Sequence, residues 1–327
     1  MSNLPNKAVL RHVVDVHCHP TDAPSISSDS MDRLDIIICA MSTMKQDQQK
    51  VRELAAFYPE KVIPCFGYHP WFSYLISIGS TTKEEHYKKL LLESSKSSTT
   101  DIEAFTKLLP MLPDPMPLSE MLADLRKSFS LFPEKSMLGE VGLDRIFRIP
   151  YDYFANPRQL TPFTIPIDHQ TAILEAQLDL AVELGRNVSI HSVKSQLATI
   201  ELLTRMQKKH GTKWQQINVD MHSCGLSPET WRQLEKKHSN VFLSLSTVIN
   251  SRHANHRALI ACCSPERILV ESDYNDVEMV TGKTWEILCT IADIKGWPIE
   301  EDWEEVGTAA MGAVHRLEKN WQRFSGE

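Results

Sequence analysis

Six residues of the types that bind metal ions stand at the ends of short apolar runs spread over most of the chain. They are four histidines, one glutamate and one aspartate: His17, His19, Glu140, His191, His222 and Asp273. Each run is typical of a buried β-strand. Strands that end at a common point would bring these side chains together, so the pattern predicts a barrel with a metal centre at one mouth.

The first run ends in Asp15-Val16-His17-Cys18-His19-Pro20. Because alternate side chains of a strand share a face, His17 and His19 point the same way and could chelate one cation. Asp15 has the same parity one step deeper. It could accept a hydrogen bond from a ligand histidine, or it could simply be a buried polar group.

The fourth run ends in Gly139-Glu140-Val141-Gly142-Leu143-Asp144, in which Glu140 and Asp144 share a face. A buried carboxylate with no cation nearby is costly, which favours Glu140 as a metal ligand. A hard oxygen ligand at that position could bridge two cations. Asp144 lies nearer the rim, where it could orient or deprotonate an attacking water.

Three further positions complete the candidate site. His191 and His222 each end a run and each precede a serine, and this equivalence on successive strands favours metal ligands over structural histidines. Asp273 ends the last run, next to the first strand in a closed barrel, and is a natural ligand and general base. His69, in the segment Gly67–Pro70, could contact a phosphate or protonate a leaving group. A strand-end histidine bonded to backbone is the plainer alternative for His69.

The six ligands exceed the four that one tetrahedral cation needs, so we expect two divalent cations bridged by Glu140. The four histidines suit Zn²⁺, whereas phosphoryl chemistry suits Mg²⁺ or Mn²⁺. The residue types therefore predict a two-metal centre and leave the identity of its metal open.

The elements that must position these residues can be marked along the chain. Eight apolar runs, most of them rich in Val and Ile, predict buried parallel strands: His12–His19, Asp35–Met41, Val62–His69, Ser136–Asp144, Asn187–His191, Ile217–Ser223, Val241–Ser246 and Ile268–Asp273. Helix-like segments separate most of them: Lys45–Tyr58, Leu118–Phe132, His169–Leu184, Lys194–His210, Ser227–Lys237 and Arg252–Ala261. This alternation predicts an α/β fold and a (β/α)₈ TIM-like barrel. An open doubly wound sheet is disfavoured, because it would not bring five strand ends to one point.

Two long insertions interrupt this rhythm, after the third and fourth strands. In Ser73–Pro117 we expect a helix at Glu84–Leu92 and a mobile Ser/Thr-rich run at Ser94–Thr100. Arg145–Pro166 leaves the barrel at the catalytic face, where it could shape a substrate cleft or be a packed surface loop.

The end of the chain is predicted to be helical at Gly282–Ile294 and Glu300–Phe324. Trp303, Met311, Leu317 and Trp321 should pack on the outside of the barrel. No internal repeat is visible, and we expect residues 1–327 to form one domain.

Composition narrows the class of protein. The chain of 327 residues is 42% hydrophobic and 24% charged, as in soluble globular proteins. It shows neither a membrane span nor the apolar core of a signal peptide. Its seven cysteines form no C-x-x-C pair, which favours reduced thiols in a cytoplasmic or nuclear protein. The net charge of −7 argues against a broad basic surface for duplex DNA, although a metal pair supplies positive charge locally.

The ordered set of motifs resembles the TatD family of metal-dependent deoxyribonucleases, within the amidohydrolase-like superfamily. The family motifs D-x-H-x-H, G-x-H-P, G-E-x-G-L-D, I-H-S, an H near a glycine and E-[ST]-D match Asp15–His19, Gly67–Pro70, Gly139–Asp144, Ile190–Ser192, His222–Gly225 and Glu271–Asp273. The resemblance covers residues 12–275, nearly the whole predicted barrel. It implies a TIM-like barrel with two divalent cations.

The resemblance also implies how the ligands are shared. His17, His19 and Asp273 would hold one cation, His191 and His222 would hold the other, and Glu140 would bridge them. The implied reaction is 3′–5′ exonuclease-like cleavage of phosphodiester bonds by an activated water, on single-stranded DNA or frayed ends. Catalytic roles would fall to Asp273, Glu140, Asp144 and His69.

The chain departs from the family pattern at places that bear on substrate range. The family often has Arg after I-H-S, where this chain has Val193, and often E-T-D-[SA]-P, where this chain has Tyr274-Asn275 after Asp273. The insertions are similar to those of a fungal branch, some of whose members are described as partners of an anaphase-promoting-complex subunit. A cell-cycle protein partner is therefore expected.

Two other functions remain open at this stage. One is a metal-dependent hydrolase of small amides or esters, which a small closed pocket would favour. The other is a protein-interaction scaffold that retains the metal site. An open cleft with Lys or Arg at its rim would favour the nuclease.

Overall fold

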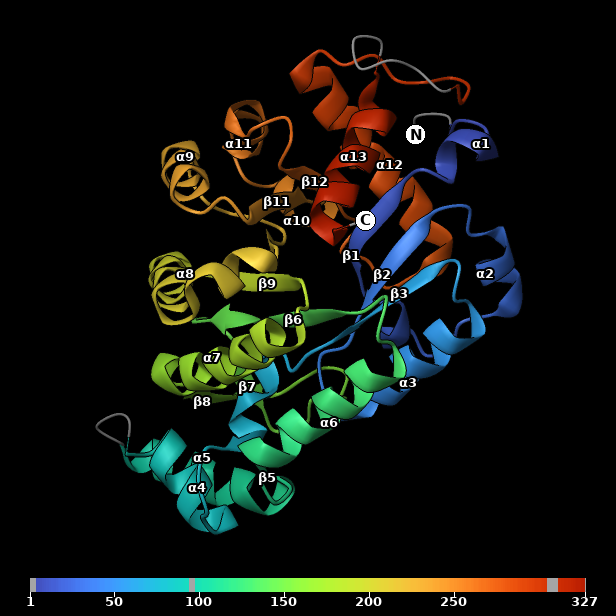
Figure 1. Cartoon of the computed structure of the whole chain (residues 1–327). Coiled ribbons are helices and arrows are strands. Elements are labelled where there is room, and N and C mark those ends of the chain that lie inside the picture. Colours follow the sequence, from blue (N-terminus) through green and yellow to red (C-terminus); the bar gives the residue numbers. More distant parts are fainter. Residues whose placement is uncertain (1–3, 94–97, 305–310, 327) are drawn as a thin grey trace.

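The computed structural model describes residues 4–93, 98–304 and 311–326 of the chain. Its centre is a sheet of eight parallel strands that curls on itself, with helices on the outside (Figure 1). The strands follow one another in space in the order of the sequence: β1 (Val14–Cys18), β2 (Ile37–Met41), β3 (Val62–Phe66), β6 (Met137–Asp144), β9 (Val188–Val193), β10 (Val219–Met221), β11 (Val241–Leu245) and β12 (Ile268–Val270). Each lies within a predicted run or overlaps it, and the unbroken order confirms the (β/α)₈ barrel over an open sheet.

The two edges of the sheet meet at the carboxyl ends of β1 and β12. The Asp273 backbone N–H donates to the His17 carbonyl at 3.0 Å, and the His19 N–H donates to the Tyr274 carbonyl at 2.9 Å. One carboxylate oxygen of Asp15 accepts the N–H groups of Ser272 at 3.0 Å and of His17 at 3.1 Å. Asp15 therefore links β1 to the segment after β12 at this seam. Of its two predicted roles, the structure favours a buried polar group over support for a histidine ring.

Helices cover the outer face of the sheet, and the main core lies between them and the strands. The larger helices of the barrel wall are α3 (Lys45–Phe57), α6 (Leu118–Leu131), α7 (Ile167–Leu184), α8 (Gln196–His210), α9 (Pro228–Lys237), α11 (His256–Cys262), α12 (Val277–Lys295) and α13 (Ala313–Ser325). Shorter elements are α1 (Lys7–Leu10), α2 (Ser28–Arg33), α10 (Thr247–Asn250), η1 (Pro20–Asp22) and η4 (Gly211–Gln216). The predicted helices agree with these bounds to within a few residues, with one exception.

That exception is the predicted helix Glu300–Phe324. Residues 300–304 are not helical, residues 305–310 lie outside the described part of the chain, and α13 begins at Ala313. The Glu300 carboxylate instead accepts the backbone N–H groups of Val314 at 2.9 Å and His315 at 3.1 Å. Free N–H groups at the start of a helix need such acceptors, so Glu300 caps the final helix from outside it. Of the four residues expected to pack on the outside of the barrel, Met311 and Leu317 are buried and Trp303 packs, partly buried, against the main core. Trp321 is buried in a separate cluster with strand residues that include Val16 and Met41.

The two insertions fold against each other beside the barrel mouth. The first contains η2 (Pro70–Leu75), β4 (Ile76–Ser77), α4 (Lys83–Leu91), α5 (Thr99–Leu108), η3 (Leu109–Met111) and β5 (Met116–Pro117), and the second is the hairpin β7 (Arg148–Pro150) and β8 (Leu160–Thr164). Helix α4 confirms the expected helix. Residues 94–97 of the run expected to be mobile lie outside the described residues, whereas Ser98 caps α5.

A second apolar cluster joins these insertions, and we call it the insertion core. It comprises Tyr74, Tyr87, Leu90, Leu91, Phe105, Leu108, Leu112, Ile149, Phe163 and Ile165. Because Ile149 and Phe163 come from the hairpin and the others mainly from the first insertion, neither insertion is an isolated loop. In the described residues, no helix combines the length and the hydropathy needed to cross a membrane.

Candidate metal centre

The six predicted ligands meet at the carboxyl mouth of the barrel, around the carboxylate of Glu140. Strand β6 carries Glu140 into the mouth, where its side chain is buried at 4% exposure. Strand β6 packs so closely on β9 that it requires a glycine at position 142, two residues after Glu140. A Cβ on Gly142 would lie 2.0 Å from the His191 carbonyl oxygen, and the φ of Gly142 is +158°. The glycine therefore lets the strands that carry Glu140 and His191 approach.

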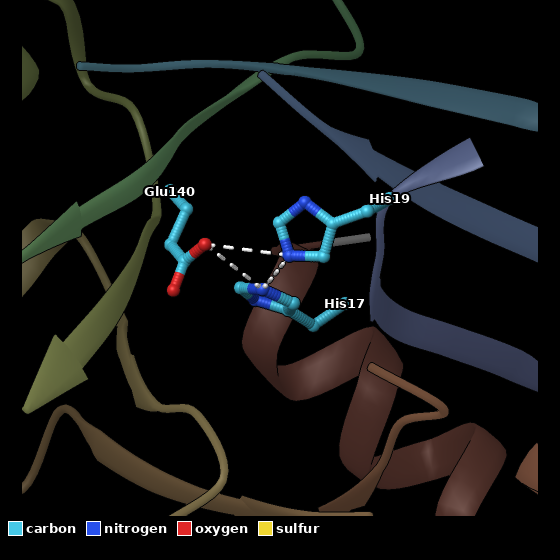
Figure 2. A group of neighbouring side chains, drawn as sticks. All are labelled: His17, His19 and Glu140. Atoms are coloured by element: carbon cyan, nitrogen blue, oxygen red, sulfur yellow. Dashed lines mark hydrogen bonds and ion pairs between the residues drawn. The ribbon is translucent and has the colours of Figure 1, made fainter. Parts of the chain in front are cut away.

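One oxygen of Glu140 faces the first strand. Its Oε2 lies 3.3 Å from His19 Nε2 and 3.7 Å from His17 Nε2 (Figure 2). Asp273 closes this side, with Oδ1 3.4 Å from His19 Nε2 and 4.0 Å from His17 Nε2. These four side chains thus bring together the donor set that was predicted for one cation.

The other oxygen of Glu140 faces a second set of histidines. Its Oε1 lies 2.8 Å from His191 Nδ1, 2.9 Å from His222 Nε2 and 3.3 Å from His69 Nε2. The His69 ring differs from the other two, because its Nδ1 accepts the backbone N–H of Trp71 at 3.2 Å. In that tautomer Nε2 carries the proton, so His69 is a hydrogen-bond donor to Glu140 and leaves His191 and His222 as the ligand-type pair.

Each of the four ligand histidines turns its other ring nitrogen towards a polar group. His17 Nδ1 bonds Ser189 Oγ at 2.7 Å, and His191 Nε2 lies 3.4 Å from Asp144 Oδ2. His222 Nδ1 lies 3.6 Å from Glu271 Oε1 and His19 Nδ1 lies 3.9 Å from Asp22 Oδ2, both beyond hydrogen-bond distance. Partners on the outer nitrogen orient a ring so that the inner nitrogen can bind a cation.

In the absence of a cation, the carboxylates and histidines of the mouth shift one another's pKa values. Burial alone would raise the pKa of Glu140, but the surrounding histidines, His69 and His222 first, hold it well below its ordinary value. Burial opposes protonation of His19 and His222, yet the neighbouring carboxylates raise the pKa of both rings well above the usual range. The positive charge of these protonated rings takes the place of the charge that a divalent cation would supply, so the donor set fits a metal ion.

The groups whose donor atoms lie close enough to share one ion support this fit. Two of them contain Glu140, one with His17 and His19 and one with His69 and His191, and their ligand atoms lie within 4.8 Å of one another. A third such group joins His17, His222 and Glu271. The Glu271 carboxylate accepts hydrogen bonds from the Ser223 hydroxyl at 2.6 Å and the Ser244 hydroxyl at 2.5 Å, which fixes it behind the His222 ring.

Asp144 is held by several donors. Its carboxylate accepts the Trp71 indole N–H at 2.7 Å and the backbone N–H groups of Ile146 at 2.8 Å and Phe147 at 3.0 Å. Although burial opposes ionisation, the hydrogen bonds from His191 and Trp71 lower the pKa of Asp144 to about 2. Because both carboxylate oxygens of Asp144 are already engaged by these donors and one of them faces His191, these contacts favour orientation of His191 over the alternative role of deprotonating water.

Sequence reasoning missed several of these supporting residues. Ser189 has the parity of His191, so strand alternation could have found it. Trp71 and Asp22 stand in irregular segments after strands, where no periodic signal marks them. Two residues of the mouth have left-handed backbone, Ser223 at φ 42° and Asp273 at φ 49°. Non-glycine residues in this region are uncommon and cluster at functional sites.

A cleft of about 720 Å³ opens above the centre. It is lined by the ligand set and by side chains from η2, from the second insertion and from later loops, among them Trp71, Phe147, Tyr153, Lys194, Gln196 and His253. Arg145–Pro166 therefore both shapes the cleft and packs into the insertion core, which combines the two alternatives that its sequence left open.

Known proteins are similar to this chain in sequence and in fold. Residues 14–311 match the family described as TatD related DNase. The Cut9-interacting protein scn1 of Schizosaccharomyces pombe is 31% identical over 333 residues, which cover 89% of this chain and 95% of that protein. An uncharacterized deoxyribonuclease of Saccharomyces cerevisiae is 28% identical over 332 residues, 96% of this chain and 99% of that one.

The same fold is found among solved structures. A TatD homolog from Escherichia coli superposes with a TM-score of 0.60 over 96% of this chain and 98% of that chain. The two sequences are 17% identical, so this likeness concerns the fold alone.

Proposed function

The chain belongs to the family of TatD-related deoxyribonucleases, which are metal-dependent hydrolases, and from that premise we propose that it cleaves phosphodiester bonds at the 3′ end of single-stranded DNA. One observation carries the proposal. The two oxygens of the Glu140 carboxylate face two different sets of ligand-type side chains. A carboxylate placed in this way suits a bridge between two cations better than a ligand to one.

We assign the ligands accordingly. His17, His19 and Asp273 would hold one divalent cation, His191 and His222 would hold the other, and Glu140 would bridge them. When bound, such a pair supplies Lewis acidity for activating water and neutralises charge on the phosphate. The histidine-rich donor set suits Zn²⁺, and the reaction class suits Mg²⁺ or Mn²⁺.

Asp273 would have a second role beside metal ligation. Asp273 is ionised, because the surrounding histidines outweigh the effect of burial and hold its pKa below the ordinary value. It lines the cleft, where it would accept the proton of the attacking water.

His69 has a different role. Burial lowers the pKa of His69 to about 4, so the ring is neutral near pH 7. Its Nε2–H, which donates to Glu140 in this structure, would donate to a phosphate oxygen in place of Glu140 when substrate is bound. Asp144 would act through His191, whose ring it orients.

The cleft is large enough to take the terminal nucleotide of a polymer. Its volume is about 720 Å³, and Lys194 is among the residues that line it. A net charge of −7 suits a substrate that enters by one end better than a duplex bound along its length.

Partner and location are also proposed from similarity. One relative is named for its interaction with Cut9, which supports a cell-cycle protein partner for this chain. Co-purification of the full-length chain with such a partner, and imaging of a tagged chain in the cytoplasm or nucleus, would test both. We further propose that residues 1–327 act as one barrel unit.

The experiment that tests the reaction uses oligonucleotides labelled at the 3′ or the 5′ end, incubated with Mg²⁺, Mn²⁺ or Zn²⁺. Wild-type protein should release labelled mononucleotides from the 3′ end first. Glu140→Ala should release none, whereas the matched control Glu201→Ala, an exposed glutamate on α8, should behave as wild type. Absence of cleavage by metal-loaded wild type would contradict the nuclease. Equal cleavage by Glu140→Ala would indicate a contaminant.

A further inference from the structure

Three partly exposed aromatic side chains line the cleft, and we call them the aromatic wall: Trp71, Phe147 and Tyr153. The Trp71 and Phe147 rings stack with centroids 5.0 Å apart and planes 12° apart. Trp71 also presents its edge to His191, with centroids 6.3 Å apart. The aromatic wall therefore lies directly beside His191, a candidate ligand of the metal centre.

The wall is fixed to the centre through Asp144. That carboxylate accepts the Trp71 indole N–H at 2.7 Å with one oxygen and the Phe147 backbone N–H at 3.0 Å with the other. The same carboxylate faces His191 Nε2 at 3.4 Å. One side chain thus sets the position of a ligand histidine and of two wall residues.

The insertion core supports the wall from behind. The Phe147 ring packs against that core, and its neighbour Ile149 is a fully buried member of it. Tyr153 packs edge-on against Phe72 with centroids 4.8 Å apart, and the Arg158 guanidinium lies 4.1 Å from the Tyr153 ring centre. Aromatic groups held in this way keep a fixed face without having to order on binding.

The rest of the lining points to what the wall would hold. Across the residues that the structure describes, the lining contains one Lys or Arg side chain, Lys194. Attraction between this one cationic side chain and the phosphates would therefore contribute little to the binding of a nucleic acid. Flat aromatic faces bind nucleobases by stacking, a contact that tolerates any base because every base has a π-face.

We propose that the aromatic wall is a base-stacking subsite that holds the nucleobase next to the scissile phosphate, and that the two insertions serve to position it. This inference rests on the proposed function, because the base is placed relative to the candidate metal centre. It assigns the insertions a role in substrate recognition.

The test uses Phe147, because Trp71 also holds Asp144 and its loss would disturb the metal centre. Phe147→Leu keeps much of the packing on the insertion core and removes the π-face. Phe147→Tyr keeps the π-face. Phe57→Leu is the matched control, because Phe57 is 78% exposed and ends α3, at the opposite end of the barrel from the cleft. Thermal unfolding of each full-length variant verifies that it is folded.

Binding is measured with single-stranded oligonucleotides whose last linkages are phosphorothioates, with Mg²⁺ present. One carries 2-aminopurine as its 3′-terminal base and its twin ends in an abasic sugar. Wild type should bind the first more tightly by about 5- to 100-fold and quench its fluorescence, as expected for one stacked base. Phe147→Leu should bring this ratio close to one and restore the fluorescence, whereas Phe147→Tyr and Phe57→Leu should keep both effects.

A wild-type ratio of one, or a ratio and quench unchanged in Phe147→Leu, would overturn the subsite. Cleavage assays on the same pair of substrates separate this failure from failure of the proposed function. Cleavage that ignores the terminal base would refute the subsite and leave the nuclease intact. Base-dependent binding that Phe147→Leu abolishes, without cleavage of any oligonucleotide, would support the subsite and refute the nuclease.

Discussion

Oε1 of Glu140 lies 2.8 Å from Nδ1 of His191, and this contact joins the centre of the barrel mouth to its wall. The opposite nitrogen of the ring faces Asp144, which in turn accepts the Trp71 indole N–H. A chain of four side chains therefore runs from the Glu140 carboxylate to the side of the cleft. A cation on the Glu140 side would bind Nδ1 and leave the Nε2 proton to Asp144.

Cation binding should release protons at neutral pH. The carboxylates of Glu140 and Asp273 raise the pKa of His19 well above its ordinary value in the absence of metal, against the effect of burial, and neighbouring carboxylates do the same for His222. Those rings must lose their protons before they ligate, so affinity should rise with pH, by about tenfold per pH unit for each proton displaced. Calorimetry in buffers of different ionisation enthalpy measures the number released. Binding that neither releases protons nor depends on pH would contradict this account of the site.

Asp144→Asn should weaken cation binding without unfolding the barrel. The amide cannot hold the His191 ring as the carboxylate does, and loss of such a partner typically costs about 10- to 100-fold in metal affinity. Competition with a chelating dye gives the affinity of the chelator-treated protein for Zn²⁺. Asp29→Asn, an exposed carboxylate on α2, serves as the control. An unchanged affinity in Asp144→Asn would show that Asp144 does not orient His191.

Gly142→Ala should destabilise the protein by several kcal/mol, on the order of the larger effects seen for single substitutions. A Cβ there would lie 2.0 Å from the His191 carbonyl oxygen, so β6 and β9 would have to separate. Gly282→Ala is the opposite case, because Gly282 is in the interior of α12 with nothing within 4 Å of its added Cβ. That substitution should stabilise by about 0.5–1 kcal/mol. Chemical denaturation of both variants tests the pair, and equal effects would refute the packing argument.

The sequence predicted those parts of the site that depend on strand alternation. His17 with His19, and Glu140 with Asp144, share faces because each pair lies on one strand at even spacing. Buried parallel strands are apolar along their whole length, so the barrel could be predicted from its eight runs, which the structure confirms. The parity of Asp15 with His17 did not decide between its two predicted roles, because the register of β1 against β2 shifts between Asp15 and Cys18. The Asp15 carboxylate instead accepts the Ser272 backbone N–H and the Thr284 hydroxyl of α12.

Other parts could not be read from the sequence. Trp71 enters the mouth from the 3₁₀ turn of η2, and its bond to Asp144 depends on how two insertions pack. Glu300 follows Pro298 in a segment whose charge pattern resembles a helix, but its carboxylate caps α13 from outside. In both cases tertiary contacts decide the conformation, and the local periodicity of the sequence does not indicate those contacts.

The most direct test of the central claim is a titration of chelator-treated, full-length protein with Mn²⁺ or Zn²⁺, wild type against Glu140→Gln, with 3′-end cleavage followed on the same samples. Glutamine keeps the size of the side chain and removes the charge that the two cations would share. Wild type should bind two equivalents per chain and cleave only when both are bound, whereas Glu140→Gln should bind fewer, more weakly, and cleave nothing. A wild-type chain that binds no divalent cation, or a Glu140→Gln chain that binds and cleaves as wild type does, would contradict the account.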